Sequence, residues 1–544
     1  MSRQTSRRTF LAGAAGIAVA GGFAGLSSAG EHGYTTEDLR IESWDGTELA
    51  ATLYLPDNDG PSPAVLSTHG WGNDRNAAAV QRTSDIYASH GYVVLTYDSR
   101  GFGDSDGQVG IDGPNEVNDA QHLITWLARR DEVLTDSEDN PRIGMDGLSY
   151  AGGIQLNTAA VDDRLDAIIP RWAWHDLSHS LGPDDVIKRG WTSLLYAVGT
   201  TGSLGLTSGQ ERPQLNDTTG MTPRLTEIYA ESTARNELAD RHEAYFKTRS
   251  AVSKLDELGK NSPPALFISG LNDVLFTPDE AIWNYDGLRE RGVESRLVLF
   301  EGAHTLFGAT PDADTQAIID GFALDWMDDH VKRKGNADLP PVTYYDIQSE
   351  VFKTTDSIPE PSRDLDLAGT GGQRAGTGEQ TVVLNSGEAT SSSQVAPRND
   401  DAAPGATAAE FAFDITEDVE LLGSPELTLP IQPIGTETKL FAKLYHVEDG
   451  EETLIHDQVT PFRLEGTQTR EVTQEMVALQ RQLAAGDQLK LVIATTDAGF
   501  YASRESAGAR LLHGEGTLSL PVAGEKSPGK SGQTSAKNKP RADD

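Results

Sequence analysis

The most restrictive feature of this chain is the stretch of residues 142–153, which reads Arg-Ile-Gly-Met-Asp-Gly-Leu-Ser-Tyr-Ala-Gly-Gly. Its pattern predicts a strand that turns sharply into a helix, with Ser149 at the apex. Such an elbow exposes a serine hydroxyl above a sheet, and only small residues fit beside it, here Gly147, Ala151 and Gly152. Similar strings at residues 25–30 and 529–532 follow no β-type run and open no apolar helix. We therefore expect an α/β sheet with Ser149 as a candidate nucleophile. The alternative is a small residue that fills a tight turn.

A serine of this kind requires an acid and then a histidine later in the chain, each just past a strand. The apolar run 265–268 leads to Asp273, and the run 296–300 leads to His304. A serine hydroxyl is a poor nucleophile until an imidazole accepts its proton, and a carboxylate orients that imidazole. The order and spacing predict a Ser149–His304–Asp273 triad.

Both partners have structural alternatives. The alternative for Asp273 is an Asx-turn in a loop, and the alternative for His304 is a loop histidine held by hydrogen bonds. Asp279 is the competing acid, but residues 277–280, Thr-Pro-Asp-Glu, have the pattern of a capping box with proline at the first helical position. We therefore expect Asp279 to serve the start of a helix.

The oxyanion hole is expected from two backbone amides. One belongs to the residue after the nucleophile, Tyr150. The other is expected in the loop after an early strand, and residues 63–68 form an apolar run into His69-Gly70-Trp71-Gly72. The backbone N–H of Trp71 is the predicted second donor, and a glycine turn that carries a packed Trp is the alternative.

The remaining pattern of the first half is one of alternating strands and helices. Residues 92–97 and 165–169 read as buried strands, and residues 117–127 repeat apolar side chains at helical spacing. A further helix is expected from about residue 310 to residue 335. This alternation predicts an α/β fold with a parallel sheet. The glycine-containing loop 98–107 has neither the Rossmann spacing nor a Walker lysine, so it gives little support to a phosphate site.

These motifs resemble those of a known family. The loop Asp98-Ser99-Arg100-Gly101-Phe102-Gly103-Asp104-Ser105-Asp106-Gly107, the Gly-Leu-Ser-Tyr elbow, Gly270-Leu271-Asn272-Asp273 and His304 are similar to those of the cocaine-esterase-like and X-Pro dipeptidyl-peptidase serine hydrolases, or CocE/NonD hydrolases. The resemblance extends over most of residues 35–523 and implies an α/β-hydrolase domain with a helical cap, followed by an all-β jelly-roll sandwich. Relatives similar to cocaine esterase place a tyrosine hydroxyl in the oxyanion hole. This chain has Trp71 in the corresponding loop, so we expect an oxyanion hole made of backbone amides alone.

In such hydrolases the insertion at about residues 175–262 resembles a cap that selects substrates. Helical stretches are expected at residues 224–231 and 236–254. An apolar pocket lined by four aromatic side chains is one interpretation, with a place in the core as the equal alternative; they are Trp172, Trp174, Trp191 and Tyr196. His175 and His179 beside Asp176 suggest a metal site only faintly, because histidines at helical spacing usually just share a face. We expect no metal and no cofactor.

After about residue 340 the helical pattern gives way to short alternating strands, which predicts a β-sandwich. Residues 369–378 and 385–403 read as long loops. The expected organisation is a signal segment at 1–29, a catalytic α/β domain at 30–340, a jelly-roll domain at 341–524 that helps shape the site entrance, and a disordered tail at 525–544.

The N-terminal residues Ser6-Arg7-Arg8-Thr9-Phe10-Leu11 are typical of a twin-arginine signal, followed by an apolar glycine-rich segment and a cleavage site ending at Ala29. The apolar run is too short for a stable membrane span, and a chain without cysteine can carry neither a lipid-anchored cysteine nor a disulfide. We therefore expect recognition by the twin-arginine translocase and an extracellular or cell-surface enzyme.

The net charge of −38, from 83 acidic and 45 basic residues, excludes a general nucleic-acid surface. Only 14 of the basic residues are lysine, and with the acidic excess this resembles proteins of extreme halophiles. In about 1 M salt the Debye length is roughly 3 Å, so self-repulsion is largely screened.

Together these patterns predict an exported serine hydrolase that acts through an acyl-enzyme on a small ester or acyl substrate. The alternative within the family is an X-Pro dipeptidyl-peptidase that takes a peptide substrate. An alternative of another class is a non-catalytic surface protein whose β-sandwich binds polysaccharide or a partner.

Overall fold

A computed structural model describes seven stretches of the chain, residues 33–205, 220–304, 311–335, 338–369, 382–385, 408–505 and 507–524. The predicted signal segment, most of the two predicted long loops and the predicted tail lie outside these residues. None of the helices in the described stretches is long and apolar enough to cross a membrane.

The first domain is built on a ten-stranded sheet in the order β1-β2-β4-β3-β7-β8-β9-β10-β11-β12. The central strands run parallel, and the pairs β1/β2, β2/β4 and β11/β12 are antiparallel. Each central strand is a short buried run that carries no exposed face. The strands are β1 (Tyr34–Glu42), β2 (Glu48–Pro56), β3 (Ala64–Ser67), β4 (Val93–Tyr97), β7 (Ile143–Leu148), β8 (Ala167–Arg171), β9 (Ala265–Gly270), β10 (Ser295–Phe300), β11 (Val342–Asp346) and β12 (Val351–Thr355). A small hairpin, β5 (Thr135–Ser137) with β6 (Asn140–Pro141), lies apart from this sheet.

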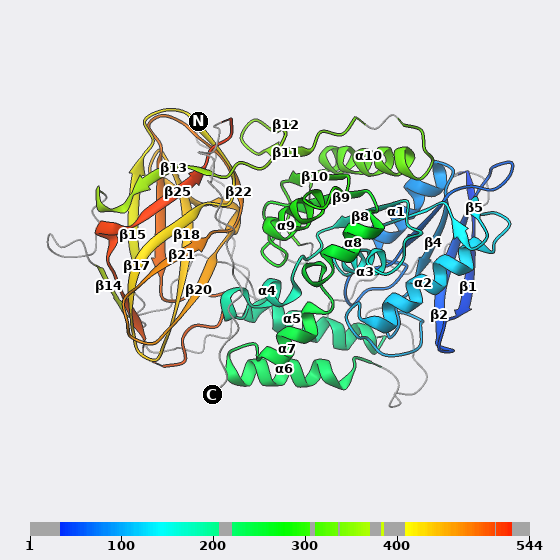
Figure 1. Cartoon of the computed structure of the whole chain (residues 1–544), viewed down its shortest axis with the longest axis horizontal. Coiled ribbons are helices and arrows are strands. Elements are labelled where there is room, and N and C mark those ends of the chain that lie inside the picture. The colour runs from blue at the N-terminus through cyan, green and yellow to red at the C-terminus, as the bar shows by residue number, and fades with distance from the viewer. Residues whose placement is uncertain are drawn as a thin grey trace, which may run out of the picture.

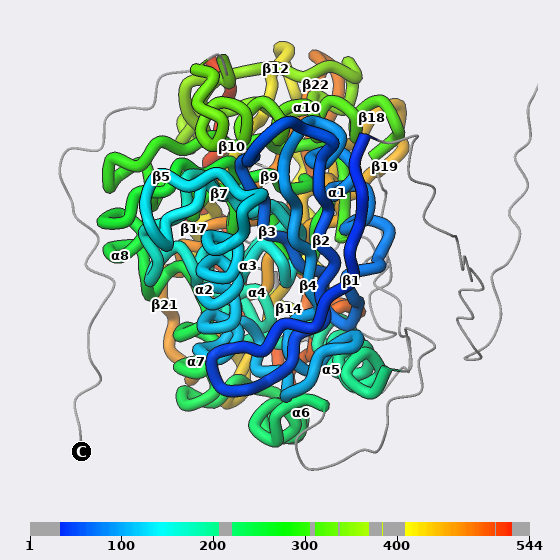
Figure 2. Tube along the Cα trace, turned by 90° about the vertical axis from the view of Figure 1, so that its right-hand side faces the viewer, coloured from blue at the N-terminus to red at the C-terminus, as the bar shows by residue number. Residues whose placement is uncertain are grey.

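Helices cover both faces of this sheet (Figures 1 and 2). Successive strand residues point to opposite faces, so that Val65 packs with α1 and α10 while Leu66 packs with α2, α3 and α9. The helices are α1 (Ala78–Ser89), α2 (Pro114–Ala128), α3 (Tyr150–Ala159), α8 (Leu255–Asn261), α9 (Pro278–Arg289) and α10 (Ala313–His330). The α/β fold with a parallel sheet predicted from the alternating pattern is confirmed, as is the α/β-hydrolase fold that the family resemblance implies.

Between β8 and β9 the chain forms a helical cap, seen below the sheet in Figure 1. It contains α4 (Leu177–Leu181), η1 (Pro183–Asp185), α5 (Arg189–Ser203), α6 (Pro223–Arg235), α7 (Asp240–Lys247) and η2 (Ala251–Ser253). The predicted stretch 224–231 lies inside α6. The predicted stretch 236–254 is wrong in extent, because Asn236 adopts a left-handed conformation that ends α6, and the next regular helix covers only Asp240–Lys247.

The second domain is made of antiparallel strands in a six-stranded and a five-stranded sheet, with β16 and β22 as a separate pair, around an apolar core of its own, on the left in Figure 1. The all-β character predicted after residue 340 is confirmed, and the jelly-roll connectivity stays a prediction. The strands are β13 (Pro361–Asp366), β14 (Val382–Asn385), β15 (Ala408–Asp414), β16 (Val419–Gly423), β17 (Glu426–Ile434), β18 (Glu437–Glu448), β19 (Glu451–Leu454), β20 (Thr460–Glu465), β21 (Arg470–Glu475), β22 (Leu479–Leu483), β23 (Gln488–Ala494), β24 (Gly508–Leu511) and β25 (Thr517–Pro521). Short 3-10 turns, η3 (Leu367–Gly369), η4 (Ile455–Asp457) and η5 (His513–Glu515), lie between them.

The two domains are packed together by buried contacts. Leu422 and Ala478 of the second domain belong to the apolar core of the first. The Asp279 Oδ1 atom accepts hydrogen bonds from the Ser424 hydroxyl at 2.9 Å and the Ala478 N–H at 3.0 Å. The capping-box interpretation is therefore wrong for the side chains: proline does open α9, but Thr277 makes no capping hydrogen bond and Asp279 joins the domains.

Candidate active site

Ser149 lies at the turn between β7 and α3 with φ 60° and ψ −118°, a backbone conformation that non-glycine residues rarely adopt. The turn is held by the Ser149 N–H, which donates to the Arg171 carbonyl at 2.8 Å. Small neighbours are required here, since a Cβ atom added to Gly152 would lie 2.9 Å from the Arg171 carbonyl oxygen. This strained geometry is the one expected for a serine raised above the carboxyl edge of a sheet.

The three predicted triad residues lie together at that edge. The Ser149 Oγ and His304 Nε2 atoms are 2.9 Å apart, and the His304 Nδ1 and Asp273 Oδ2 atoms are 2.8 Å apart. Asp273 is fully buried, and its Oδ1 atom accepts the N–H groups of Leu275 at 2.8 Å and Phe276 at 3.0 Å. With Nδ1 donating to the carboxylate, Nε2 is left as the acceptor that faces the serine hydroxyl.

Two aromatic side chains fix the imidazole plane. The rings of Phe276 and Trp191 contact His304 edge to face, with centroid distances of 5.1 and 5.7 Å. Phe276 follows the acid by three residues, and Trp191 comes from α5 of the cap. The cap therefore supports the candidate base as well as covering the site.

The predicted oxyanion loop lies beside the elbow. The Trp71 and Tyr150 rings are 5.3 Å apart, and neither backbone N–H has an acceptor among the residues that the structure describes. The Trp71 indole N–H is already used, because it donates to the Leu195 carbonyl at 2.7 Å. Of the two N–H groups of Trp71, the backbone one is thus the one left without an acceptor among the described residues, and its role in an oxyanion hole together with Tyr150 stays a prediction.

His69 holds this loop in place. Its ring is buried, its Nδ1 atom lies 2.8 Å from the Gly70 carbonyl oxygen, and its Nε2 atom accepts the Ser99 N–H at 3.1 Å. Burial lowers the pKa of His69, which favours the neutral ring that this pair of contacts requires. A structural role for this histidine was not foreseen from the sequence.

An apolar cavity of about 130 Å³ opens next to Ser149. We refer to it below as the apolar cavity. The Ser149 elbow and the Trp71 loop form one side of the cavity, and helices α4, α5, α6 and α7 of the cap form the other. Cap side chains supply most of its surface, including Leu181, Leu195, Met221, Leu225, Ile228 and Phe246. Sequence reasoning missed these residues, although the apolar spacing of Leu225 and Ile228 in the predicted helix was a usable signal.

The four aromatic residues predicted for a pocket are divided by the structure. Trp174 and Tyr196 line the apolar cavity. Trp172 does not: its backbone has a positive φ of 47°, and its ring packs on Phe300 at 5.2 Å within the core on the α1 and α10 face of the sheet. Trp191 packs on His304 and borders a smaller cavity shared with the second domain. The pocket assignment is therefore corrected for Trp172 and Trp191.

The histidines that faintly suggested a metal site have protein partners. His175 Nδ1 lies 3.0 Å from Asn284 Oδ1, and His179 Nδ1 lies 2.9 Å from Glu280 Oε1. Burial alone would lower the pKa of His179, but the hydrogen bond that its ring donates to the Glu280 carboxylate raises the pKa above the usual value. These contacts attach the start of the cap to α9.

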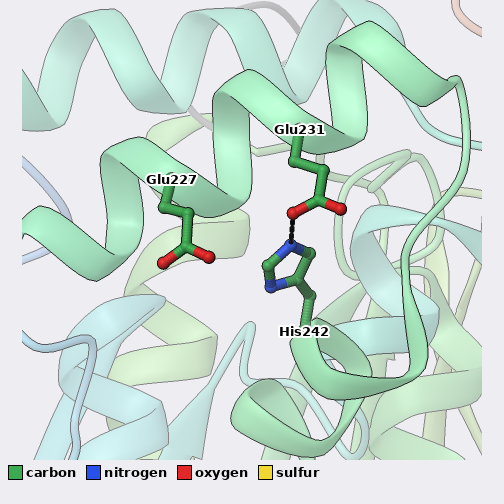
Figure 3. A group of neighbouring side chains, drawn as sticks. All are labelled: Glu227, Glu231 and His242. Carbon is green, nitrogen blue, oxygen red and sulfur yellow. Dashed lines mark hydrogen bonds and ion pairs between the residues drawn. The ribbon is translucent and has the colours of Figure 1, made fainter.

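A second cluster brings Glu227 and Glu231 of α6 close to His242 of α7, as Figure 3 shows. The His242 Nε2 and Glu231 Oε2 atoms are 2.9 Å apart. Both carboxylates also pair with arginines: Arg224 reaches Glu227 at 2.8 Å, and Arg235 reaches Glu231 at 3.0 Å. Since arginine already neutralises the acids, this cluster is a salt-bridge network that joins two cap helices.

Comparison with known families divides the chain in the same way as the structure. Residues 45–306 match the model of the X-Pro dipeptidyl-peptidase S15 family, and residues 334–526 match the X-Pro dipeptidyl-peptidase C-terminal non-catalytic domain. The first match contains the elbow, the acid and the histidine.

The individual proteins that resemble this chain share only a modest part of its sequence. Cocaine esterase of Rhodococcus is 26% identical over 294 residues, which cover 49% of this chain and 48% of that protein. A CocE/NonD family hydrolase from Staphylococcus aureus has a similar structure, with a TM-score of 0.66 at 16% identity over 90% of this chain and 94% of that one. An aminopeptidase from a marine sediment Thaumarchaeota archaeon gives a TM-score of 0.67 at 14% identity, over 90% and 96% of the two chains. The chain spans about half the length of the curated relatives it matches.

Proposed function

Since the chain belongs to the family of S15 X-Pro dipeptidyl-peptidases and CocE/NonD hydrolases, we propose that it is a serine hydrolase that cleaves esters of apolar carboxylic acids through an acyl-enzyme. The single observation that carries this proposal is the continuous hydrogen-bonded series Ser149–His304–Asp273 at the mouth of the apolar cavity.

In the proposed reaction, His304 Nε2 accepts the Ser149 Oγ proton while Oγ bonds to the ester carbonyl carbon. The carbonyl oxygen becomes an oxyanion that receives the backbone N–H groups of Trp71 and Tyr150. As the carbon–oxygen bond to the alcohol breaks, His304 returns the proton to the departing alcohol. Water then enters and gives a proton to His304 Nε2 while its oxygen bonds to the acyl carbon. The bond between that carbon and Ser149 Oγ breaks, His304 returns the proton to Oγ, and the free acid leaves.

The lining of the apolar cavity favours an acyl group over a peptide N-terminus. A free α-amine is a cation at neutral pH, and holding it in a buried site requires carboxylates or carbonyl oxygens. Among the described residues that line the cavity none is aspartate or glutamate. The nearby Asp112 lies beside Tyr150, and burial together with Glu116 raises its pKa well above the usual value, which disfavours the charge that an ammonium group would need.

The volume of the apolar cavity suits a small acyl group. A cavity of about 150 Å³ in another protein accommodates benzene. By this measure a volume of about 130 Å³ fits an acyl group of about six carbons. We propose short-chain or single-ring acyl esters as substrates.

The place of action is part of the proposal and rests on sequence. Arg7 and Arg8 support export by the twin-arginine translocase, and the net charge of −38 supports function in concentrated salt. Both features are compatible with an enzyme that meets its esters outside the cell.

The experiment compares kcat/KM for ethyl benzoate or ethyl hexanoate with that for an Ala-Pro anilide, on one preparation in molar salt. An ordinary alkyl ester is used because activated esters react with many proteins. The proposal expects efficient ester cleavage and little anilide cleavage.

The N-acetylated anilide supplies the control. Efficient cleavage of the free anilide without cleavage of its acetylated form would show that the enzyme reads the α-amine, and the X-Pro peptidase function would replace the esterase. No turnover of either class, with no labelling of Ser149 by a fluorophosphonate, would favour the non-catalytic surface protein.

A further inference from the structure

Gln458 belongs to the second domain but reaches the loop that carries the candidate acid. It follows η4 in the connection between β19 and β20, and the residue is 7% exposed. Its Nε2 amide donates to the Leu271 carbonyl at 2.8 Å and to the Asp273 carbonyl at 3.0 Å. One side-chain amide thus uses both of its hydrogens on the turn that contains Asp273.

The Leu271 and Asp273 carbonyls lie just past the end of β9, where the chain no longer pairs as a strand. The Leu271 and Asn272 N–H groups still bond to Phe300 and Gly302 on the neighbouring strand and its loop, at 2.8 and 3.0 Å. Buried carbonyl groups require donors, and here the donor comes from a residue 185 positions away from Asp273. Because Gln458 binds the carbonyl of the acid itself, it fixes the peptide plane that adjoins the Asp273 Cα atom, from which the side chain extends toward His304.

The segment that carries Gln458 is itself rigidly held. The two preceding residues, His456 and Asp457, both have positive φ values, 54° and 59°. Such strained residues persist only where the surroundings determine them. His456 is buried, its Nε2 atom lies 2.6 Å from the Gln480 carbonyl oxygen, and burial lowers its pKa to about 4. The ring therefore stays neutral at the pH of an enzyme assay, and the turn keeps one shape.

A second contact from the same domain supports the histidine. The Tyr501 N–H donates to the Ile187 carbonyl at 3.0 Å, just before α5. The next residue, Lys188, donates from Nζ to the Leu275 carbonyl at 2.8 Å, and α5 then places Trp191 against His304. The second domain thus contacts the supports of both the acid and the base.

We infer that Gln458 is a positioning residue for the triad, through which the second domain holds Asp273 in line with His304. This inference rests on the proposed function, because it assigns Gln458 an effect on a reaction at Ser149. It gives a domain that matches a non-catalytic family model a direct part in the geometry of catalysis. The second domain is then required for full activity of the first.

The test replaces Gln458 with Met, which has similar volume and no amide, and measures kcat and KM for the alkyl ester. A shift of about 1 Å in a catalytic group costs on the order of 10²-fold in rate. We expect kcat to fall about 10- to 100-fold with KM unchanged, since Gln458 is not among the residues that line the apolar cavity. The acidic limb of the kcat/KM profile should also move to lower pH, because a displaced Asp273 stabilises the imidazolium less.

The matched control is Gln482→Met. Gln482 lies on β22 of the same domain and donates to Asp346 Oδ2 of the first domain at 2.6 Å, so this change also breaks a bond between the domains. Its kcat and its pH profile should match those of the wild type. A second variant, Gln458→Glu, keeps the shape but replaces the donor amide with an acceptor, and should lose as much kcat as Gln458→Met.

The outcomes separate this inference from the proposed function. If the wild-type enzyme labels at Ser149 and turns over esters, yet Gln458→Met keeps its kcat and pH profile, the positioning role is overturned. The same holds if Gln482→Met loses as much activity, because the effect would then belong to domain packing in general. A wild-type enzyme that neither labels nor turns over would instead overturn the proposed function.

Discussion

Replacing Asp273 with Asn should inactivate the enzyme through the tautomer of His304. The carboxylate accepts three hydrogen bonds, two from backbone N–H groups at Oδ1 and one from His304 at Oδ2. An asparagine must turn its single oxygen to the two N–H groups of Leu275 and Phe276, so its NH₂ group faces His304 Nδ1. That nitrogen must then accept, and the proton moves to Nε2, where the ring can no longer take a proton from Ser149.

The size of the effect follows from this change of role. The same substitution in serine proteases with this triad lowers kcat about 10⁴-fold. A factor of 10⁴ corresponds to about 5.5 kcal/mol of transition-state stabilisation. In the other orientation the asparagine NH₂ group would face the N–H groups of Leu275 and Phe276, which are also donors. The NH₂ group therefore faces His304 Nδ1, and we expect a loss of this order in kcat with little change in KM.

Asp279→Asn is the control within the same segment. The Asp279 Oδ1 atom accepts both of its hydrogen bonds, one from Ser424 and one from Ala478. An asparagine also has an Oδ1 atom, so it can accept the same two hydrogen bonds. Burial raises the pKa of Asp279 to about 6. Between about pH 4 and 6 Asp279 is therefore protonated more in the native state than in the unfolded state, and its contribution to the free energy of unfolding falls as pH rises. The shift of about two units costs up to about 3 kcal/mol at pH 7.

The assays are steady-state turnover of the alkyl ester and thermal unfolding at pH 4 and pH 7. We expect Asp279→Asn to keep wild-type kcat, to be at least as stable as the wild type at pH 7, and to show a weaker dependence of stability on pH between 4 and 6 than the wild type, because the contribution of Asp279 is removed. A large loss of kcat in Asp279→Asn with an active Asp273→Asn would assign the acid to Asp279 and refute the reasoning.

Three further outcomes test other parts of the account. The melting temperature should fall as salt is lowered from 1 M to 0.1 M. The Debye length then grows from roughly 3 Å to about 10 Å, and the acidic side chains behind the net charge of −38 repel one another more strongly. A constant melting temperature would show that the acidic surface has no such effect. Replacing Arg7 and Arg8 with lysine should leave the precursor in the cytoplasm, measured by fractionation, and unchanged secretion would contradict twin-arginine export. Ile228→Trp should fill the apolar cavity and lower kcat/KM for a benzoate ester about tenfold or more while sparing an acetate ester; equal effects on both would place the acyl group elsewhere.

The triad could be predicted from sequence because each member follows a short buried strand. β7, β9 and β10 are buried runs with unambiguous ends, and the elbow is a local pattern of small residues around Ser149. In a parallel sheet such ends meet at one edge, so Asp273 and His304 could be placed beside Ser149 without knowledge of long-range contacts.

Helix α5 could not be predicted in the same way, because its glycines read as helix breakers. In the structure they allow close approach: a Cβ atom on Gly199 would lie 2.4 Å from the Trp71 ring, and one on Gly202 would lie 2.4 Å from the Gly72 carbonyl oxygen. The demand for small residues comes from a loop more than 120 positions earlier in the chain. Tertiary packing here overrides helix propensity.

The remaining misses also depend on distant partners. Trp172 turns into the core because of a positive φ at the end of β8, which a single sequence does not reveal. Asp279 and Gln458 carry ordinary local patterns, and their roles appear only when the second domain packs on the first. Polar contacts between domains leave no periodic signal in the sequence.

The most direct test of the central claim is to trap the acyl-enzyme. The enzyme is mixed with a benzoate ester, quenched in acid during turnover, and analysed by mass spectrometry of the intact protein and its peptides. The account predicts one added benzoyl group on Ser149, absent from Ser149→Ala, which should fold normally and retain only the roughly 10³- to 10⁴-fold acceleration over water that an oxyanion hole and binding provide. Turnover at the wild-type rate by Ser149→Ala, or a benzoyl group on another residue, would contradict the account.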